Sequence, residues 1–223
     1  MFSNAEGQMT CVDLSEQQLT CFPNELFLQT ELEELNLSHN QIEEMPAEVG
    51  LLQNLSGALH VEYNQMKELP STIGNLHKLK SLNISHNQFV QIPEEIGMLI
   101  QLTHLSIDHN QIMTIPRSFY TLVHLKEFYA GYNQIAEIQD FTPSFSSLEV
   151  LDLQANQLKR FPGKMFKCQA LKVLNMRGNQ VTEVPSELLQ LTNLQELDLR
   201  DNPIEDVPPW LDILVERGCN VQI

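Results

Sequence analysis

Eight asparagines recur along the chain at one interval of 24 residues and then six intervals of 23. They are Asn40, Asn64, Asn87, Asn110, Asn133, Asn156, Asn179 and Asn202, and Gln17 takes the same place one interval earlier. Most follow a Leu-x-x-Leu-x-Leu run, as residues 32–37 precede Asn40. A unit of this length cannot bury its apolar face alone, so units must stack on one another. The spacing therefore predicts a solenoid of about nine copies, numbered here from the copy of Gln17.

Each copy contains the same succession of local signals. Apolar residues alternate with polar ones before the asparagine, which predicts a short strand with alternate side chains pointing inward. The asparagine amide is expected to pair backbone groups that the following turn would leave buried. Proline follows in eight of the nine copies, and apolar residues three apart then predict one turn of helix or 3-10 helix, as in residues 94–99. The predicted fold class is α/β.

These residues resemble the leucine-rich repeat family across essentially the whole chain. The 23-residue form, with Ile115-Pro116 and Ile96-Gly-x-Leu99, is most similar to the intracellular class that includes Ras-group and Ras-suppressor-like scaffolds. The resemblance implies a horseshoe with a parallel sheet on its concave face and short helical, 3-10 or extended segments on its convex side. We expect a single domain over 1–223, with a capping repeat (1–31), seven central repeats (32–193) and a last repeat with a C-terminal cap (194–223).

Two copies depart from the pattern. The third has one extra residue near Gly57, which predicts a local bulge. The sixth has Ala130 where a large inward residue is expected and Gln139 where proline is expected. Phe128 and Phe141 could refill the space at Ala130, or the irregular copy could serve a function, and the sequence leaves both open.

The C-terminal residues read as a cap. Residues 208–215 predict a longer helical segment, and residues 219–223 alternate like a last strand. Together they would shield the apolar edge of the last repeat.

The charge is strongly negative and unevenly distributed. The formal net charge is -16, no Lys or Arg precedes Lys67, and eight of the thirteen basic residues lie at or after Lys159. Nucleic acid and anionic membrane are therefore unsuitable partners. The acidity either maintains solubility or favours a partner with a basic surface.

Nothing in the sequence indicates export or membrane insertion. The first residues have neither a basic segment nor an apolar one, and no run of 18 uncharged apolar residues occurs. The four cysteines are scattered, which fits a reducing compartment. We expect a cytoplasmic chain, with delivery into a host cell by a non-classical route as the alternative.

The repeat register assigns the outward strand positions to the concave face. The candidate partner-binding residues on or just beyond the strands are Glu34, Asn36, His39, His60, Glu62, Tyr63, Asn83, His86, His104, Asp108, His109, Glu127, Tyr129, Tyr132, Asp152, Arg177 and Arg200. The other outward positions are Asp13, Ser15, Ser38, Ser81, Ser85, Ser106, Gln154, Asn175, Glu196 and Asp198. Five of the seven histidines and three of the four tyrosines fall on this side.

Three interpretations of the histidine and tyrosine cluster stay open. The side chains could form a protein-binding surface, because Tyr and His give amphipathic contact area. They could instead stack on neighbours in adjacent repeats. His86 and His109 with Asp108 could also hold a metal, although no tight ligand motif is present. A catalytic dyad from Ser85 or Ser106 with His109 lacks an expected water-excluding pocket, so we expect no enzyme.

The leading hypothesis is a non-catalytic, monomeric interaction module or scaffold that binds a protein on its concave face, without cofactor or metal. The resemblance implies small GTPases, phosphatases or kinase-pathway proteins as partner classes and a role in signalling. Glu34, Glu62, Asp108 and Glu127 would attract a basic partner, while His60, Tyr63, Tyr129 and Tyr132 would form the contact core. The alternatives are a bacterial effector that binds a host protein and a targeting domain of a larger enzyme.

Overall fold

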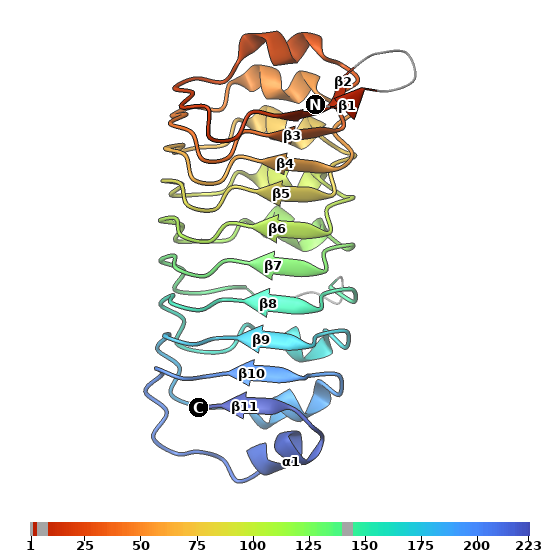
Figure 1. Ribbon diagram of the computed structural model, residues 1–223. Coiled ribbons are helices and arrows are strands. Elements are labelled where there is room, and N and C mark those ends of the chain that lie inside the picture. The colour runs from red at the N-terminus through yellow and green to blue at the C-terminus, as the bar shows by residue number, and fades with distance from the viewer. Residues whose placement is uncertain (1, 4–8, 140–144) are drawn as a thin grey trace.

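The backbone forms one continuous sheet in which the strands follow the order of the chain (Figure 1). The structure is a computed structural model that describes residues 2–3, 9–139 and 145–223. The strands are β1 (Phe2–Ser3), β2 (Met9–Asp13), β3 (Glu34–Asn36), β4 (Ala58–His60), β5 (Ser81–Asn83), β6 (His104–Ser106), β7 (Glu127–Tyr129), β8 (Val150–Asp152), β9 (Val173–Asn175), β10 (Glu196–Asp198) and β11 (Asn220–Gln222). Strands β2 to β11 pair in parallel, as the repeat predicts.

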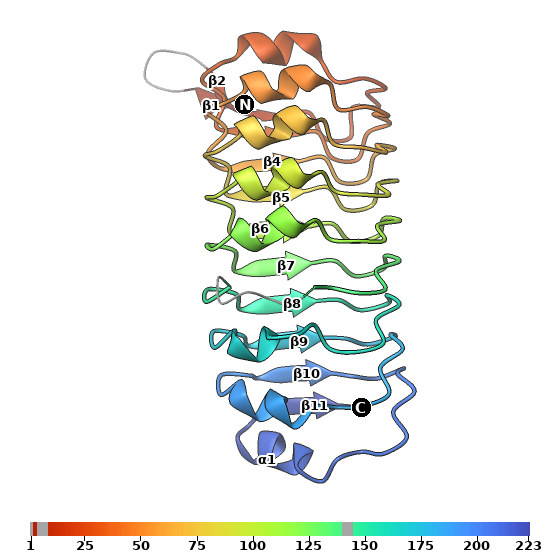
Figure 2. The same ribbon diagram turned by 180° about the vertical axis from the view of Figure 1, so that it is seen from behind.

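Short helices lie behind the sheet (Figure 2). The 3-10 helices are η1 (Asn24–Leu28), η2 (Ala47–Leu51), η3 (Ser71–Asn75), η4 (Glu94–Met98), η5 (Arg117–Thr121), η6 (Met165–Lys167) and η7 (Ser186–Gln190). All except η6 begin directly after a proline in extended conformation, whose carbonyl accepts the first helical hydrogen bond. Proline suits this position because no N–H is needed there and its φ is already fixed.

The core runs between the sheet and these helices. One inward residue in each of the strands β2 to β10 is buried, and these are Val12, Leu35, Leu59, Leu82, Leu105, Phe128, Leu151, Leu174 and Leu197. Burying one such side chain stabilises the fold by about 1.5–3 kcal/mol. Because every copy adds the same set of contacts to its neighbours, the fold needs no single deep core.

The extra residue of the third copy is accommodated immediately before β4. The N–H groups of Ser56 and Gly57 both donate to the carbonyl of Glu33, and pairing then continues with Leu35 opposite Leu59. A Cβ on Gly57 would lie 2.5 Å from Cγ of Glu34, so a larger residue here would require the exposed side chain of Glu34 to shift.

Aromatic rings cluster in the core at the sixth copy, where Ala130 takes the place of a larger residue. Phe119, on η5, lies with its ring centroid 4.6 Å from that of Phe128 and 5.2 Å from that of Phe145, and all three side chains are buried. Phe141, the second residue predicted to refill this space, lies outside the described residues. The helix that the repeat predicts directly after Gln139 falls on residues 140–144, which also lie outside the described residues.

The two ends of the sheet differ from each other. At the C-terminal end, the predicted helix and strand are both present, as α1 (Leu211–Glu216) and as β11, which pairs in parallel with β10. At the N-terminal end, β1 pairs antiparallel with β2, with Phe2 opposite Cys11. This antiparallel strand was not predicted from the sequence, because two residues are too few to show a period.

Candidate functional site

The asparagine ladder, which comprises the eight repeating asparagines, fixes the turn after each strand. In the fifth copy, the amide nitrogen of Asn110 donates to the carbonyls of Ile84, Ile107 and Asp108 at 3.1 Å each. Its amide oxygen accepts from the N–H of Phe89 at 3.0 Å. The amide thus pairs backbone groups of its own copy and of the preceding one, as the repeat predicts.

An aromatic column lies next to this ladder, formed by the residue before the asparagine in copies two to six: His39, Tyr63, His86, His109 and Tyr132. Successive ring centroids lie 4.0–4.2 Å apart, and the ring planes differ by 10–16°. The side chains remain exposed, Tyr63 by 45% and Tyr132 by 47%, with only His86 more covered. The rings therefore stack on one another and still present their edges to solvent.

The local backbone explains the alignment of the column. All five residues have a φ between 50° and 55°, the left-handed region in which the chain turns sharply after each strand. The same backbone in consecutive copies points the five side chains the same way, one strand spacing of about 4.8 Å apart. The repeat register places these residues beyond the strands but does not predict their positive φ. The available sequence signal for this positive φ was that all five residues stand directly before a repeating asparagine.

The polar side chains on the strands are largely engaged with one another. Nδ1 of His60 lies 3.4 Å from Oε2 of Glu62, and this interaction with the carboxylate raises the pKa of His60. The hydroxyl of Tyr129 donates to Oε2 of Glu127 at 3.0 Å. Burial and this neighbouring carboxylate raise the pKa of Tyr129 to about 12. Nε2 of His104 also approaches Oε1 of Glu127, at 3.4 Å.

Asp108 holds the turn of the sixth copy. Its Oδ1 accepts from the N–H of Gly131 at 2.7 Å, and its Oδ2 accepts from the hydroxyl of Ser106 at 2.8 Å. Gly131 leaves room for this contact, because a Cβ there would lie 3.3 Å from Oδ1 of Asp108 and 2.9 Å from Cγ of Gln154. Burial raises the pKa of Asp108 despite these hydrogen bonds.

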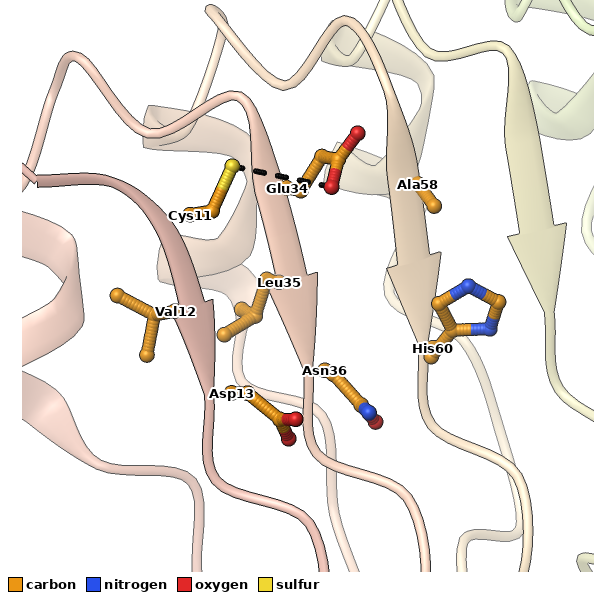
Figure 3. A pocket seen from close by; sticks show the side chains of 8 residues that line it. All are labelled: Cys11, Val12, Asp13, Glu34, Leu35, Asn36, Ala58 and His60. Atoms are coloured by element: carbon orange, nitrogen blue, oxygen red, sulfur yellow. Dashed lines mark hydrogen bonds between the residues drawn. The ribbon is translucent and has the colours of Figure 1, made fainter. Parts of the chain in front are cut away.

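Glu34, Asn36 and His60 surround a shallow hollow at the N-terminal end of the sheet (Figure 3). The hollow has a volume of about 250 Å³, and its other lining residues are Cys11, Val12, Asp13, Leu35 and Ala58. Sγ of Cys11 donates to Oε2 of Glu34 at 3.7 Å. Two carboxylates and apolar walls make this end of the sheet suitable for a basic side chain.

The C-terminal end of the sheet instead carries ion pairs. Arg200 donates from both Nε and Nη2 to the carboxylate of Asp198, and Nε of Arg177 donates to Oδ2 of Asp201 at 2.7 Å. Burial would raise the pKa of Asp198, but the hydrogen bonds and charge of Arg200 outweigh it and hold that pKa below its usual value.

None of the candidate partner-binding residues is buried. Three other outward positions are buried, in contrast to their placement on an open face: Ser38, Ser85 and Asp198, at 4%, 6% and 5% exposure. The two serines are short and lie beside longer side chains, and Asp198 is covered by Arg200. Asn36 and Asn83 each accept the N–H of the residue two positions later, so both help to end their strands.

The geometry does not favour metal binding or serine catalysis. His86 and His109 are stacked 4.0 Å apart with nearly parallel planes, so their nitrogen lone pairs do not converge on one point. No group of three potential ligands from His, Cys, Asp and Glu gathers within the described ranges. Ser85, one of the two dyad serines, is buried.

Within residues 2–3, 9–139 and 145–223, no helix could span a bilayer.

Structures of known proteins share this fold. The LRR protein LIC12759 of Leptospira interrogans superposes with a TM-score of 0.77 and 27% identity over 94% of this chain. The plant peptide hormone receptor RGFR1, in complex with RGF2, superposes with a TM-score of 0.72 and 24% identity over 90% of this chain. A TDR receptor superposes with a TM-score of 0.67 and 24% identity over 87%.

This chain spans 64%, 37% and 39% of the lengths of those three chains, respectively. No curated protein sequence matches it. The model of the leucine rich repeat matches residues 30–89, 57–112, 77–135 and 146–204. Since these matches cover most of the sequence and the fold agrees, the chain belongs to the leucine-rich repeat family.

Proposed function

We propose that this protein is a non-catalytic interaction module that binds a protein partner on the sheet face and the aromatic column. Leucine-rich repeat domains generally serve as protein-interaction modules. The observation that supports this placement is the column itself, in which five consecutive copies present exposed, stacked rings in one line. Contiguous exposed apolar surface on a protein often marks an interaction site.

The stacked rings suit binding for an entropic reason. Ordering a flexible side chain at an interface costs about 0.5–1.5 kcal/mol. The rings of Tyr63, His86 and His109 are held between neighbours on both sides, so much of their freedom is already lost in the free protein. The column would therefore present aromatic contact area at a low further cost.

The partner we propose has a basic surface. Glu34, Asp108, Glu127 and Asp152 face the same side as the column, and the hollow at the N-terminal end has acidic walls. The resemblance to Ras-group and Ras-suppressor-like scaffolds favours a small GTPase, a phosphatase or a kinase-pathway protein, and hence a signalling role. One similar structure, the plant receptor RGFR1, is a complex with RGF2, so a related fold binds a ligand.

We propose a cytoplasmic monomer. The four cysteines are free thiols, as expected in a reducing compartment. The similarity to a Leptospira interrogans protein favours a second candidate, a bacterial effector delivered into a host cell, and gene neighbourhood and codon usage distinguish the two. A targeting domain of a larger enzyme is the third candidate, which the full open reading frame tests.

The test replaces Tyr129 and Tyr132 together by alanine. We expect affinity capture from cytosolic extract to lose the partner by at least tenfold, because a tyrosine at an interface hot spot contributes about 2 kcal/mol, which is about thirtyfold in affinity. The thermal melt should stay within a few degrees of that of the natural protein. The matched control replaces His77 and His124, which lie in turns before the strands, and should retain capture. Capture that survives the tyrosine change would assign binding to another face.

A further inference from the structure

Small residues shape the hollow at the N-terminal end of the sheet. Ala58 begins β4, and the equivalent positions on later strands carry larger side chains, such as Glu127 and Val150. Gly57, directly before it, has no side chain, and a Cβ there would lie 2.6 Å from Oε1 of Glu34. The missing side-chain volume leaves the shallow hollow of about 250 Å³ on the sheet face.

Two carboxylates line this hollow at different corners (Figure 3). The strand pairing places Glu34 opposite Cys11, and Asp13 opposite Asn36. Asp13 and Glu34 therefore lie on neighbouring strands, about 4.8 Å apart, and are offset along them by two residues, about 6.6 Å. The carboxylate of Glu34 lies toward Cys11, and that of Asp13 lies beside Asn36. A cation in the hollow would have a negative charge on two sides.

Both carboxylates keep acceptor capacity for a cation. Oε2 of Glu34 accepts only the weak thiol donor of Cys11, at 3.7 Å. Oδ1 of Asp13 accepts the N–H of Ser15 at 3.0 Å and its hydroxyl at 2.8 Å. These hydrogen bonds, the backbone one foremost, lower the pKa of Asp13, so it is charged at neutral pH. Across residues 9–139 and 145–223, no Lys or Arg forms an ion pair with either carboxylate, and none precedes Lys67 in the sequence.

The other end of the sheet shows how this fold accommodates an arginine. Asp198 occupies in β10 the strand position that Asp13 occupies in β2, and Arg200 occupies that of Ser15. The guanidinium of Arg200 donates to Asp198 from Nε at 3.0 Å and from Nη2 at 2.5 Å. A carboxylate at this strand position can therefore receive two guanidinium hydrogen bonds. The first copy has the carboxylate and no arginine of its own.

We propose that the hollow binds an arginine side chain of the protein partner. The guanidinium lies between Glu34 and Asp13, and its aliphatic stem lies against Ala58. This inference rests on the proposed function, since it assumes that the partner contacts the sheet face.

Arginine fits two separated carboxylates better than the other cations do. Its guanidinium carries five N–H donors around a plane, so it can donate to acceptors on different sides at once. The ammonium of lysine is a compact charge that holds its hydration more strongly. A metal ion needs more ligands at short range, and no group of three His, Cys, Asp and Glu side chains gathers within the described part of the chain.

The test titrates the nitrogen-15-labelled protein with two capped peptides, Ac-Gly-Arg-Gly-NH2 and Ac-Gly-Lys-Gly-NH2, at low salt, and follows the backbone amide shifts. The changes Glu34→Gln and Asp13→Asn remove one charge each and keep the shape of the side chain. The matched control is Glu33→Gln, which removes the same charge one residue away, at a side chain that does not line the hollow.

A second variant fills the hollow and keeps its charges. Ala58→Leu adds an apolar side chain at a position where the sheet already tolerates branched ones, since Val150 and Val173 occupy it in β8 and β9. Its thermal melt should stay within a few degrees of that of the natural protein. Loss of binding in this variant would show that the arginine enters the hollow and is not merely attracted by the acidic surface.

We expect the arginine peptide to shift the amides of β2, β3 and β4, and the lysine peptide to bind about fivefold more weakly. Glu34→Gln and Asp13→Asn should each weaken arginine binding about tenfold, the scale of one hydrogen bond to a charged group. Ala58→Leu should abolish binding, while Glu33→Gln should change it by less than about twofold. Equal affinities for the two peptides, or unchanged arginine binding by Glu34→Gln or Ala58→Leu, would overturn the proposal.

The outcome is separable from that of the proposed function, because the peptide titration does not involve Tyr129 and Tyr132. Partner capture that depends on the two tyrosines, together with peptides that bind equally, would contradict the arginine site alone. Arginine binding in the hollow, together with partner capture that survives the tyrosine change, would contradict the proposed function alone.

Discussion

The asparagine ladder and the aromatic column run side by side, one residue apart in each copy, yet they obey different constraints. Seven of the eight asparagines, Asn40 to Asn179, are buried, and the ladder continues through Asn202. The column is exposed and extends over only five copies, ending at Tyr132. The asparagine is needed because it pairs buried backbone groups. The neighbouring position needs only a residue that tolerates positive φ, so its side chain is free to vary between copies.

The change Asn110→Ala tests the ladder and should have the largest effect. It leaves the N–H of Phe89 without an acceptor in a buried turn and removes one of the hydrogen bonds that three carbonyls accept, although each carbonyl keeps another donor. Since an orphaned buried N–H costs about 1–3 kcal/mol and each further lost hydrogen bond about 0.5–1.5 kcal/mol, we expect a loss of about 3–5 kcal/mol in the free energy of unfolding. Urea denaturation followed by circular dichroism measures it.

The matched control is Asn193→Ala. Asn193 is exposed and makes one hydrogen bond, from its amide nitrogen to the carbonyl of Gln169 at 2.7 Å. Its loss should cost at most about 1 kcal/mol. Similar losses in the two variants would show that burial of the ladder does not determine its importance.

The change His109→Ala tests the column and should cost less. It removes two ring contacts, with His86 at 4.0 Å and with Tyr132 at 4.1 Å. Aromatic pairs contribute about 0.5–1.5 kcal/mol each at most, and exposure lowers this, so we expect a loss of about 1 kcal/mol. The backbone should persist, because Ala155 already adopts a φ of 49° at the equivalent position.

The control for this change is His124→Ala, which removes an exposed histidine outside the column and should alter stability by less than about 0.5 kcal/mol. If His109→Ala were as costly as Asn110→Ala, the column would be a structural element like the ladder. The ladder and the column would then contribute equally to stability, against the comparison drawn above.

The fold could be predicted almost completely because the repeat fixes the register. One strong period determines which side chains point inward, so Leu35 or Leu105 could be assigned to the core without coordinates. The exceptions were local. The two-residue strand β1 has no period to detect, and the extra residue before β4 is absorbed by backbone hydrogen bonds that the period does not specify.

The candidate site was less predictable, because it depends on lateral neighbours. The sequence located the histidines and tyrosines on one side, and it left stacking and partner binding as alternatives. The structure shows the stacking, while binding stays a prediction. The contacts of Asp108 with Gly131 and of His60 with Glu62 depend on side-chain geometry that a one-dimensional period does not contain.

The smallest effect concerns protonation within the column. Burial, and then the charge of stacked His109, lower the pKa of His86, although Asp108 opposes this shift. The unfolded chain therefore takes up a proton at His86 at a higher pH than the folded protein does, and stability falls as the pH drops through about 6.5, the ordinary histidine pKa. His86→Tyr keeps a ring in the stack and removes this titration. The melting temperature of the natural protein should therefore fall relative to that of His86→Tyr as the pH is lowered from about 7.5 to about 5.5.

His60 should behave with the opposite sign, which makes it a control within the same sheet face. Its pKa is raised by Glu62, so its stabilising contribution is complete below pH 6.5 and is lost as the pH rises through the raised folded-state value. His60→Gln should therefore cost more stability at pH 6 than at pH 8.5, while His86→Tyr gains most at low pH. Parallel responses of the two variants would mean that stacking in the column does not set the protonation of His86.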